Sequence, residues 1–253
     1  MVYDCLMIED EAPLAENTCK YLNLSGIDAA AVSGVEGYHE FIKGNTARMI
    51  LLDINLKDGC GYNLCRQIRE ETQVPIIRKS MQSLLKFLLQ LSKPKSILEV
   101  GTAVGFSALL MSEYGPEDCR ITTIEKYEKR IPIAKENFRR AGKEDRITLL
   151  EGDAAEILKG LEGAYDFIFM DAAKGQYIHF LPDILRLLAD GGMLVSDNVL
   201  QDGDVIESRF AVTRRNRTIH ARMREYLYEL KHHPWLETVI LPVGDGVTLS
   251  IRK

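Results

Sequence analysis

The 253-residue chain has few cysteines, a single tryptophan and no long run of apolar residues. No stretch of 18 or more apolar residues appears, so the sequence does not predict a transmembrane helix. The first ten residues carry three acidic side chains and no basic segment of the kind that begins a secretory signal, and we therefore expect a cytoplasmic protein without membrane contact. The cysteines are odd in number and lack metal-ligand spacing, so we interpret them as reduced packing residues: Cys5, Cys19, Cys60, Cys65 and Cys119.

A large excess of one charge is also missing, because the net charge is only −5 at neutral pH. This overall acidity does not favour nucleic-acid binding. The charge is unevenly distributed: residues 1–76 carry 12 acidic and 6 basic side chains, whereas residues 77–253 carry 25 and 26. With 46% apolar residues the chain can bury one large core or two smaller ones. We predict two segments, residues 1–76 and 77–253, without a Gly/Ser linker between them.

The first segment has a βαβαβα pattern with acidic residues at the ends of strands. We expect strands at residues 5–8, 28–32 and 49–52, and helices ending near residue 24 and covering residues 35–43 and 61–70. Glu9 and Asp10 follow the first strand, and Asp53 follows the third. Because acids placed in this way meet at one edge of a parallel sheet, they could hold a cation such as Mg²⁺.

Two stretches of this segment resemble the receiver domain of two-component response regulators: M-I-E-D-E and L-L-D-I-N-L-K-D-G-C-G-Y. The resemblance implies a flavodoxin-like half-domain in which Glu9 and Asp10 hold a metal, Asp53 accepts a phosphoryl group and the backbone of Asn55 completes the site. After V-P-I-I, however, a helix is expected over residues 82–91, so the Thr or Ser and the later Lys of receivers have no counterpart. A remnant scaffold and a phosphorylation-gated signalling protein are both open interpretations.

The second segment is organised around a short strand and a glycine turn, S-I-L-E-V-G-T-A-V-G-F-S. The strand carries Glu99, Gly101 and Gly105 form the turn, and a helix is expected to begin at Ser107. Such a turn lets the backbone approach a ligand at the carboxyl end of a parallel strand. Glu125 ends the next strand 20 residues after Gly105, where nucleotide-binding folds place the acid that binds ribose hydroxyls. The sequence therefore predicts a nucleoside site.

Later strands in this segment also end in oxygen-bearing side chains. We expect strands at residues 146–150, 166–170 and 193–196, and a C-terminal hairpin of residues 238–241 and 247–252 around an Asp-Gly turn. Asp171 follows the second of these strands, and Asp197 and Asn198 follow the third. A single Asp at a strand end can equally be a helix N-cap, but three oxygen groups from two strand ends can fill part of a Mg²⁺ or Ca²⁺ shell.

Besides the glycine turn, residues 74–253 contain T-T-I-E, E-G-D-A, F-I-F-M-D-A-A-K-G-Q-Y, V-S-D-N-V-L and P-V-G-D-G-V. Together these motifs resemble the metal-dependent class I O-methyltransferases that use S-adenosylmethionine, the family of catechol- and caffeoyl-CoA-type enzymes. Within this family, the sequence resembles in particular the bacterial branch that methylates 5-hydroxyuridine at the wobble position of tRNA. The resemblance implies an α/β fold, a Rossmann-like sheet with an antiparallel C-terminal hairpin. The leading helices of the family are missing, which suggests a fusion or an engineered chimera joined at V-P-I-I.

The resemblance also assigns roles to individual residues. The predicted S-adenosylmethionine contacts are Ile77, Glu99, Gly101, Gly105, Ser107, Glu125, Asp153, Ala154 and Asp171. The predicted ligands of Mg²⁺, or of Ca²⁺ or Mn²⁺, are Asp171, Asp197 and Asn198. Lys174 is the predicted general base beside the acceptor hydroxyl, and Asp171 is counted with it among the catalytic residues.

The methyl acceptor is left open between RNA and a small molecule. Arg214, Arg215 and Arg217 suit phosphate contacts, which favours 5-hydroxyuridine in tRNA, although a solvated helix start explains them equally well. A catechol-like phenol or an acyl-CoA ester of the caffeoyl-CoA type is the alternative acceptor. An inactive chimeric scaffold is the alternative from another class, and a homodimer is a further expectation.

Overall fold

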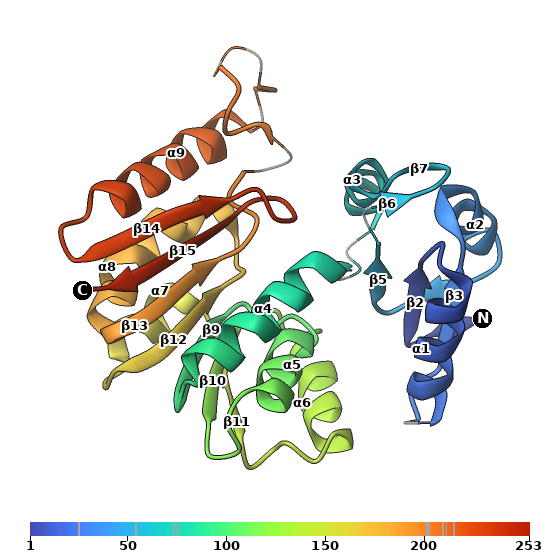
Figure 1. The fold of residues 1–253 in the computed structure, drawn as a ribbon, viewed down its shortest axis with the longest axis horizontal. Helices are drawn as coiled ribbons and strands as arrows, with labels where there is room; N and C mark the ends of the chain where they lie inside the picture. Colours follow the sequence, from blue (N-terminus) through green and yellow to red (C-terminus); the bar gives the residue numbers. More distant parts are fainter. Residues whose placement is uncertain are drawn as a thin grey trace. The chain divides into compact units, whose positions relative to one another are not determined.

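Figure 1 shows the computed structural model of the chain, which describes residues 1–253 except 25, 54, 73, 75, 201, 202, 209, 211 and 215. For residues 55, 62, 66, 69, 70 and 76–80 only the backbone is described. The chain divides into two compact units, Met1–Ser83 and Leu84–Lys253, and α4 (Lys79–Ser92) crosses the division. In the described part of the chain, no helix has both the length and the apolar character needed to cross a membrane.

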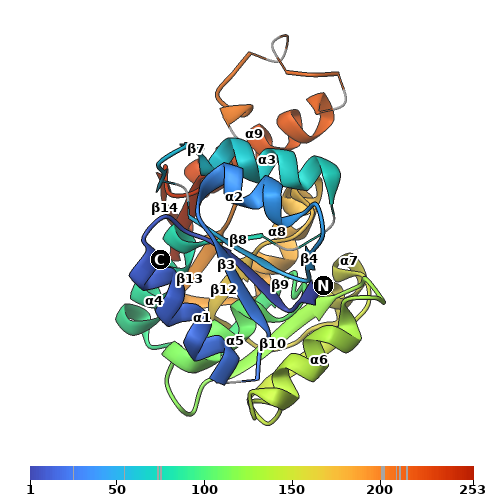
Figure 2. The same cartoon turned by 90° about the vertical axis from the view of Figure 1, so that its right-hand side faces the viewer.

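The first unit is built on a parallel sheet with the strand order β3-β2-β5-β8. Its strands are β1 (Val2–Tyr3), β2 (Cys5–Ile8), β3 (Ala29–Val32), β4 (Thr46–Ala47), β5 (Ile50–Leu52), β6 (Asn55–Leu56), β7 (Gly59–Cys60) and β8 (Ile76–Arg78). Its helices are α1 (Ala12–Leu24), α2 (Gly34–Phe41) and α3 (Gly61–Glu71). Helix α1 lies on one face of the sheet, and α2 and α3 lie on the other (Figures 1 and 2). This is the flavodoxin-like arrangement that the sequence predicts.

Strand β2 shows why both faces of this sheet are covered. Because side chains alternate along a strand, Leu6 and Ile8 face the cluster under α2 and α3, whereas Cys5 and Met7 face the cluster under α1. All four side chains are buried. A strand buried on both faces reads as a continuous apolar run, and C-L-M-I is such a run.

The cysteines are all free thiols, and four of the five are buried. Desolvation raises the pKa of the Cys5 thiol to about 12 and that of Cys119 to about 11. These thiols therefore stay protonated and act as packing groups, as the sequence predicts. Cys60 differs from the prediction, because it is exposed at the end of β7.

The second unit is built on a mixed sheet with the strand order β11-β10-β9-β12-β13-β15-β14. Its strands are β9 (Ser96–Val100), β10 (Arg120–Glu125), β11 (Ile147–Glu151), β12 (Tyr165–Met170), β13 (Leu188–Ser196), β14 (Leu236–Leu241) and β15 (Val247–Arg252). Its helices are α5 (Phe106–Tyr114), α6 (Ile131–Arg140), α7 (Ala154–Gly160), the short 3₁₀ helix η1 (Lys174–Gln176), α8 (Tyr177–Leu187) and α9 (Arg217–His232). Strand β15 runs antiparallel to both of its neighbours, which confirms the predicted Rossmann-like sheet with a C-terminal hairpin.

The order of the parallel strands reverses beside β9. From β9 the chain proceeds outward to β10 and β11, and then returns to the other side of β9 with β12 and β13. Open α/β sheets bind ligands outside the carboxyl ends of the strands where the order reverses. In this unit that point lies between the ends of β9 and β12, at Gly101 and Asp171.

The main core of the second unit lies between the sheet and helices α7, α8 and α9. Leu98, Val100 and Ile168 point into this core from the strands, and Phe180 and Ile184 meet them from α8. Glu99 lies between Leu98 and Val100 on β9, so the alternation of side chains along a strand places it on the opposite face of the sheet. A buried carboxylate on a core strand needs a partner, so Glu99 is a candidate functional residue.

Several boundaries differ from those predicted. Strand β13 begins at Leu188 and runs through Gly191 and Gly192, whereas the sequence predicts a turn at these glycines and a strand from residue 193. The pairing of β12 with β13 changes register in this stretch, between Tyr165 and Phe167. Gly191 has φ +73°, and the pairing with β12 jumps from Leu188 to Met193, so the two glycines form an irregularity within β13 at the place of the predicted turn.

Candidate active site

The glycine turn after β9 is too tightly packed to accept side chains. Gly101 has φ +110°, and a Cβ placed on it would lie 2.1 Å from the Asp171 carbonyl oxygen. Gly105 has φ +88°, and its Cβ would lie 2.5 Å from the ring of Phe138. Ala103 between them also has a positive φ, of +50°. The predicted turn is therefore present, and the missing side chains let the ends of β9 and β12 touch.

Glu125 fastens this turn to the end of β10. Its Oε2 accepts the Ala103 N–H at 2.8 Å, and its Oε1 accepts the Tyr127 N–H at 2.8 Å. Each carboxylate oxygen can accept more than one hydrogen bond, so lone pairs remain for a ligand hydroxyl. The residue predicted to bind ribose thus also shapes the turn that faces the ligand.

Glu99 is fully buried, and its two oxygens differ in their hydrogen bonding. Thr123 Oγ1 donates to Oε2 at 2.5 Å, while Oε1 has no hydrogen bond within the described part of the chain. Desolvation raises the pKa of Glu99 to about 7, the nearby charges of Asp171 and Glu125 add to the rise, and the Ser107 and Thr123 side chains oppose it. An unsatisfied buried carboxylate oxygen favours a ligand that brings a donor or a positive charge.

Asp153 is the N-cap residue of α7. A helix N-cap is the alternative role that the sequence offers for an acid at the end of a strand. Its Oδ1 accepts the Ala155 N–H at 2.9 Å, and this hydrogen bond is the main cause of its lowered pKa. Lys126 Nζ lies 3.3 Å from its Oδ2, and Ala154 is the first residue of the helix. The predicted S-adenosylmethionine contact of these two residues stays a prediction.

The ends of β12 and β13 bring the three predicted metal ligands together. Asn198 Nδ2 donates to Asp171 Oδ1 at 3.2 Å, and the Asn198 N–H donates to Asp197 Oδ1 at 2.6 Å. Asn198 is buried and has φ +58°, an uncommon backbone conformation for a residue other than glycine. The described residues contain no metal-binding group of three or more His, Cys, Asp or Glu side chains. A cation here would therefore depend on the Asn198 amide together with two carboxylates.

Lys174, the predicted base, forms an ion pair that the sequence did not reveal. Its Nζ lies 3.1 Å from Asp245 Oδ2, and the two side chains are 24% and 1% exposed. Asp245 lies in the turn between β14 and β15, and its carbonyl accepts the Leu200 N–H at 2.8 Å. Sequence analysis treated Asp-Gly only as a hairpin signal; the acid in P-V-G-D-G-V was the signal that could have identified Asp245.

Tyr177 is a second residue that sequence analysis missed. Its buried hydroxyl lies 3.1 Å from the carbonyl oxygens of both Met170 and Asp197, and it accepts the Ala172 N–H at 3.2 Å. Burial raises its pKa well above the ordinary value, so the hydroxyl keeps its proton. Tyr177 thus links the backbone that carries Asp171 to the backbone that carries Asp197. The tyrosine that ends F-I-F-M-D-A-A-K-G-Q-Y was the sequence signal that could have identified it.

Two of the three predicted RNA-binding arginines lie in the described structure, and their phosphate contacts stay a prediction. Arg214 is exposed, and Arg217 begins α9, where its Nε donates to the Val212 carbonyl at 3.2 Å. Arg215 lies outside the described residues. Ile77 belongs to β8 of the first unit, so its predicted cofactor contact also stays a prediction.

At the acidic edge of the first unit, some carboxylate oxygens already accept hydrogen bonds from other residues of the unit. Ile8 and Leu52 are paired across β2 and β5, so Glu9 and Asp53 follow adjacent strands. Asp10 accepts the Ser33 hydroxyl at 2.7 Å and also the Lys57 N–H. Asn55 begins β6 directly beyond this edge. The structure thus gathers the predicted receiver residues, and their metal binding and phosphorylation stay predictions.

Comparison with known proteins identifies the family. Residues 62–253 match the family model of the O-methyltransferases, and residues 5–94 match that of the response regulator receiver domain. The chain therefore belongs to the O-methyltransferase family. More particularly, it is an O-methyltransferase domain preceded by a receiver domain. Both models match residues 62–94, the stretch that contains the predicted boundary at residues 76 and 77.

Individual relatives agree with this assignment. Caffeoyl-CoA O-methyltransferase 1 of Eucalyptus globulus is 33% identical over 181 residues, which cover 66% of this chain and 71% of that protein. The SAH-bound methyltransferase PaMTH1 of Podospora anserina is 33% identical with a TM-score of 0.63, covering 68% of this chain and 78% of its own. The O-methyltransferase from Bacillus cereus in complex with SAH is 25% identical with a TM-score of 0.65, covering 76% and 90%.

Proposed function

We propose that the second unit binds S-adenosylmethionine at the glycine turn and transfers its methyl group to a hydroxyl held between Asp171, Lys174 and Asn198. The observation that carries this proposal is the meeting of two sites at one edge. The turn at Gly101 touches the backbone of Asp171, so the predicted nucleoside site adjoins the oxygen-rich strand ends. Solved relatives are bound to SAH, the product of such a transfer.

The proposed cofactor contacts are the carboxylate oxygens that can still accept hydrogen bonds. S-adenosylmethionine supplies a methyl group on a positively charged sulfur and carries an ammonium group on its methionine part. Glu99 Oε1 would accept that ammonium, because it is buried and has no partner in the described chain. Glu125 would accept the ribose hydroxyls with its remaining lone pairs. Holding the acceptor oxygen and the methyl carbon in attack geometry can contribute about 7–11 kcal/mol.

The residues at the ends of β12 and β13 fit a magnesium ion. Mg²⁺ prefers oxygen ligands, uses one or two carboxylates and keeps several waters, which agrees with two aspartates and one amide. Asn198 would turn its amide oxygen, in place of Nδ2, towards the ion. A bound cation would favour the deprotonated form of the acceptor hydroxyl. The Tyr177 hydroxyl keeps the two strand ends in register for this purpose.

Lys174 would take the proton from the acceptor hydroxyl. Neutral Lys174 accepts the proton at Nζ, and the Asp245 carboxylate 3.1 Å away stabilises the ammonium that results. The ion pair with Asp245 is the arrangement that Lys174 would hold after this transfer. Asp245 is nearly fully buried and so acts as a positioning residue, which fixes where Nζ lies.

The acceptor that the relatives favour is a small phenol of the caffeoyl-CoA or catechol type. A second candidate is 5-hydroxyuridine in tRNA, which the basic run ending at Arg217 and the resemblance of the sequence favour. Both acceptors offer a hydroxyl on a planar ring beside another oxygen, so one site geometry serves either.

Calorimetric titration with S-adenosylmethionine, with and without Mg²⁺, tests this proposal. We expect the parent chain and a surface control, Asp145→Ala, to bind the cofactor, and Asp171→Ala to bind it more weakly and to lose methyl transfer. Transfer of a labelled methyl group to caffeoyl-CoA, catechol and hydroxylated tRNA then identifies the acceptor. A well-folded parent chain that does not bind the cofactor would contradict the active-enzyme proposal and favour the inactive scaffold.

A further inference from the structure

Three buried residues, Thr102, Thr123 and Glu99, form a chain of hydrogen bonds between the glycine turn and strands β9 and β10. Thr102 Oγ1 lies 2.5 Å from Thr123 Oγ1, and Thr123 Oγ1 lies 2.5 Å from Glu99 Oε2. Thr123 and Glu99 are paired directly across the two strands, whereas Thr102 belongs to the turn. The turn is thus connected to the buried carboxylate through side chains as well as through the backbone.

The chain of hydrogen bonds has a single direction when Glu99 is ionised. An ionised carboxylate can only accept hydrogen bonds, so the Thr123 hydroxyl donates to it. A hydroxyl carries one proton, so Thr123 has none left for Thr102 and must accept a hydrogen bond from it. Thr102 therefore donates to Thr123, and Thr123 donates to Glu99. Hydrogen bonds linked in this way polarise and strengthen one another in a protein interior.

This arrangement determines which oxygen of Glu99 is left for a ligand. Oε2 accepts the hydrogen bond from Thr123, whereas Oε1 has no hydrogen-bond partner among the residues that the structure describes. Turning the carboxylate away would break the contact with Thr123, so the chain fixes the orientation of Oε1. A buried acceptor held in this way suits a group that brings a donor, such as an ammonium.

Packing alone does not require hydroxyl groups at these two positions. Valine has nearly the shape of threonine, and burying a hydroxyl has a cost unless it forms a hydrogen bond. The next residue of the turn shows a related contact, because the Ala103 N–H donates to Glu125 Oε2 at 2.8 Å. Two consecutive residues of the turn therefore hold the two acids of the proposed cofactor site, Thr102 through its side chain and Ala103 through its backbone.

We propose that Thr102 and Thr123 are positioning residues for the recognition of an ammonium group by Glu99. The inference rests on the proposed function, since the ammonium is that of the methionine part of S-adenosylmethionine. The Thr123 hydroxyl stabilises the negative charge on Glu99 and holds Oε2, so that Oε1 faces the ligand. Thr102 acts one step further away, by orienting the Thr123 hydroxyl. Both residues act through Glu99, so their effect is confined to ligands that carry the ammonium.

Calorimetric titration of the full chain with two ligands tests this role. SAH carries the ammonium, whereas 5′-methylthioadenosine has the same nucleoside and sulfur but lacks the amino-acid part. We expect Thr123→Val to weaken SAH binding about tenfold, and Thr102→Val to weaken it about threefold, because the hydrogen bond to the charged group is the stronger one. Both variants should bind 5′-methylthioadenosine like the parent. Thr123→Ser keeps the hydroxyl and should bind SAH like the parent.

Thr122→Val is the matched control, because Thr122 lies on the same strand and alternation places it on the opposite face of the sheet. It should bind both ligands like the parent. Unchanged SAH binding in Thr123→Val, an equal loss for both ligands, or a loss in Thr123→Ser as large as in Thr123→Val would each overturn the positioning role. The proposed function survives these results, because the parent still binds SAH. A folded parent that binds neither ligand contradicts the proposed function and the inference with it.

Discussion

The burial of Glu99 on strand β9 changes the pH at which its carboxyl group ionises. Its pKa is raised from 4.5 to about 7, chiefly by burial, so the folded apoprotein favours the protonated carboxyl. The stability that this group contributes is therefore fully present below pH 4.5 and is lost as the pH rises through about 7. A ligand ammonium needs the ionised carboxylate, so ligand binding and proton release at Glu99 are coupled.

The first prediction follows from this coupling. We expect the affinity for S-adenosylmethionine to fall as the pH is lowered through about 7, and Glu99→Gln to remove this dependence. The substitution should weaken binding about ten- to a hundredfold, the effect of losing one hydrogen bond to a charged group. Calorimetric titrations on both sides of this pH measure it, with the exposed Glu117→Gln as control. An unchanged pH profile in the Glu99→Gln variant would show that another group controls binding.

Asp245 supports a prediction that separates positioning from cofactor binding. Its carboxylate holds the Lys174 ammonium but has no predicted contact with S-adenosylmethionine. We expect Asp245→Asn to lower the rate of methyl transfer about a hundredfold, because misplacing a catalytic group has effects of that size, and to leave cofactor affinity unchanged. Rate measurements over a pH series, beside calorimetry, test this. A parallel loss of cofactor binding would indicate a structural role instead.

At the scale of the element, the glycine turn after β9 is set by steric contact as well as by backbone conformation. The two causes can be separated, because Gly101 and Gly163 both have positive φ, of +110° and +97°. A Cβ on Gly101 would clash with the Asp171 carbonyl, whereas a Cβ on Gly163 would meet nothing within 4 Å. Only a substitution at Gly101 therefore measures the effect of the close contact between the ends of β9 and β12.

We expect Gly163→Ala to lower the free energy of unfolding by about 1–2 kcal/mol, the cost of a left-handed conformation for a residue with a side chain. Gly101→Ala should cost at least twice as much and should also abolish S-adenosylmethionine binding, because the strand ends must separate. Urea unfolding and calorimetry measure the two effects. Equal losses of stability in the two variants would show that the contact with Asp171 is unimportant.

At the scale of the whole molecule, the chain consists of two compact units, each with a core cluster of its own. The clusters around β2 and β5 contain residues of the first unit only, and the cluster under α7, α8 and α9 contains residues of the second only. The single tryptophan, Trp235, belongs to the second unit. A ligand of one unit should therefore act on the unfolding of that unit.

We expect heat to unfold the chain in two transitions, of which only one responds to S-adenosylmethionine. At a hundred times its Kd, a ligand stabilises the unit that binds it by about 2.7 kcal/mol. The shifted transition should coincide with the change in tryptophan fluorescence. Differential scanning calorimetry with parallel fluorescence tests this, and a single transition seen by both methods would show that the units unfold together.

The sequence alone determined the class of fold and most of the strand ends that meet at the candidate site. A short continuous apolar run such as C-L-M-I is typical of a parallel strand that is buried on both faces. Glycines and acids directly after such runs mark the carboxyl-end edge of the parallel sheet. Gly101, Glu125, Asp171 and Asn198 were all identified in this way. The signal is local, because each residue lies next to the strand that positions it.

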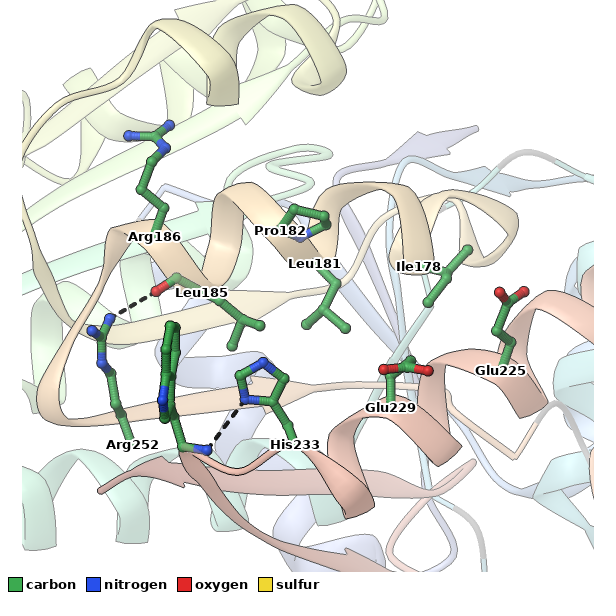
Figure 3. Close-up of a pocket in the computed structure, with 10 residues that line it drawn as sticks. Ile178, Leu181, Pro182, Leu185, Arg186, Glu225, Glu229, His233 and Arg252 are labelled. Carbon is green, nitrogen blue, oxygen red and sulfur yellow. Dashed lines mark hydrogen bonds between the residues drawn. The ribbon is translucent and has the colours of Figure 1, made fainter.

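The tertiary structure alone decided how residues distant in sequence meet. The ion pair between Lys174 and Asp245 and the hydroxyl of Tyr177 between two strand ends depend on how the hairpin and α8 pack on the sheet. The groove between α8, α9 and the C-terminal hairpin likewise requires these elements together (Figure 3). Strand periodicity records which side chains are buried, but it contains no information on which of them become neighbours, because packing between elements fixes those distances.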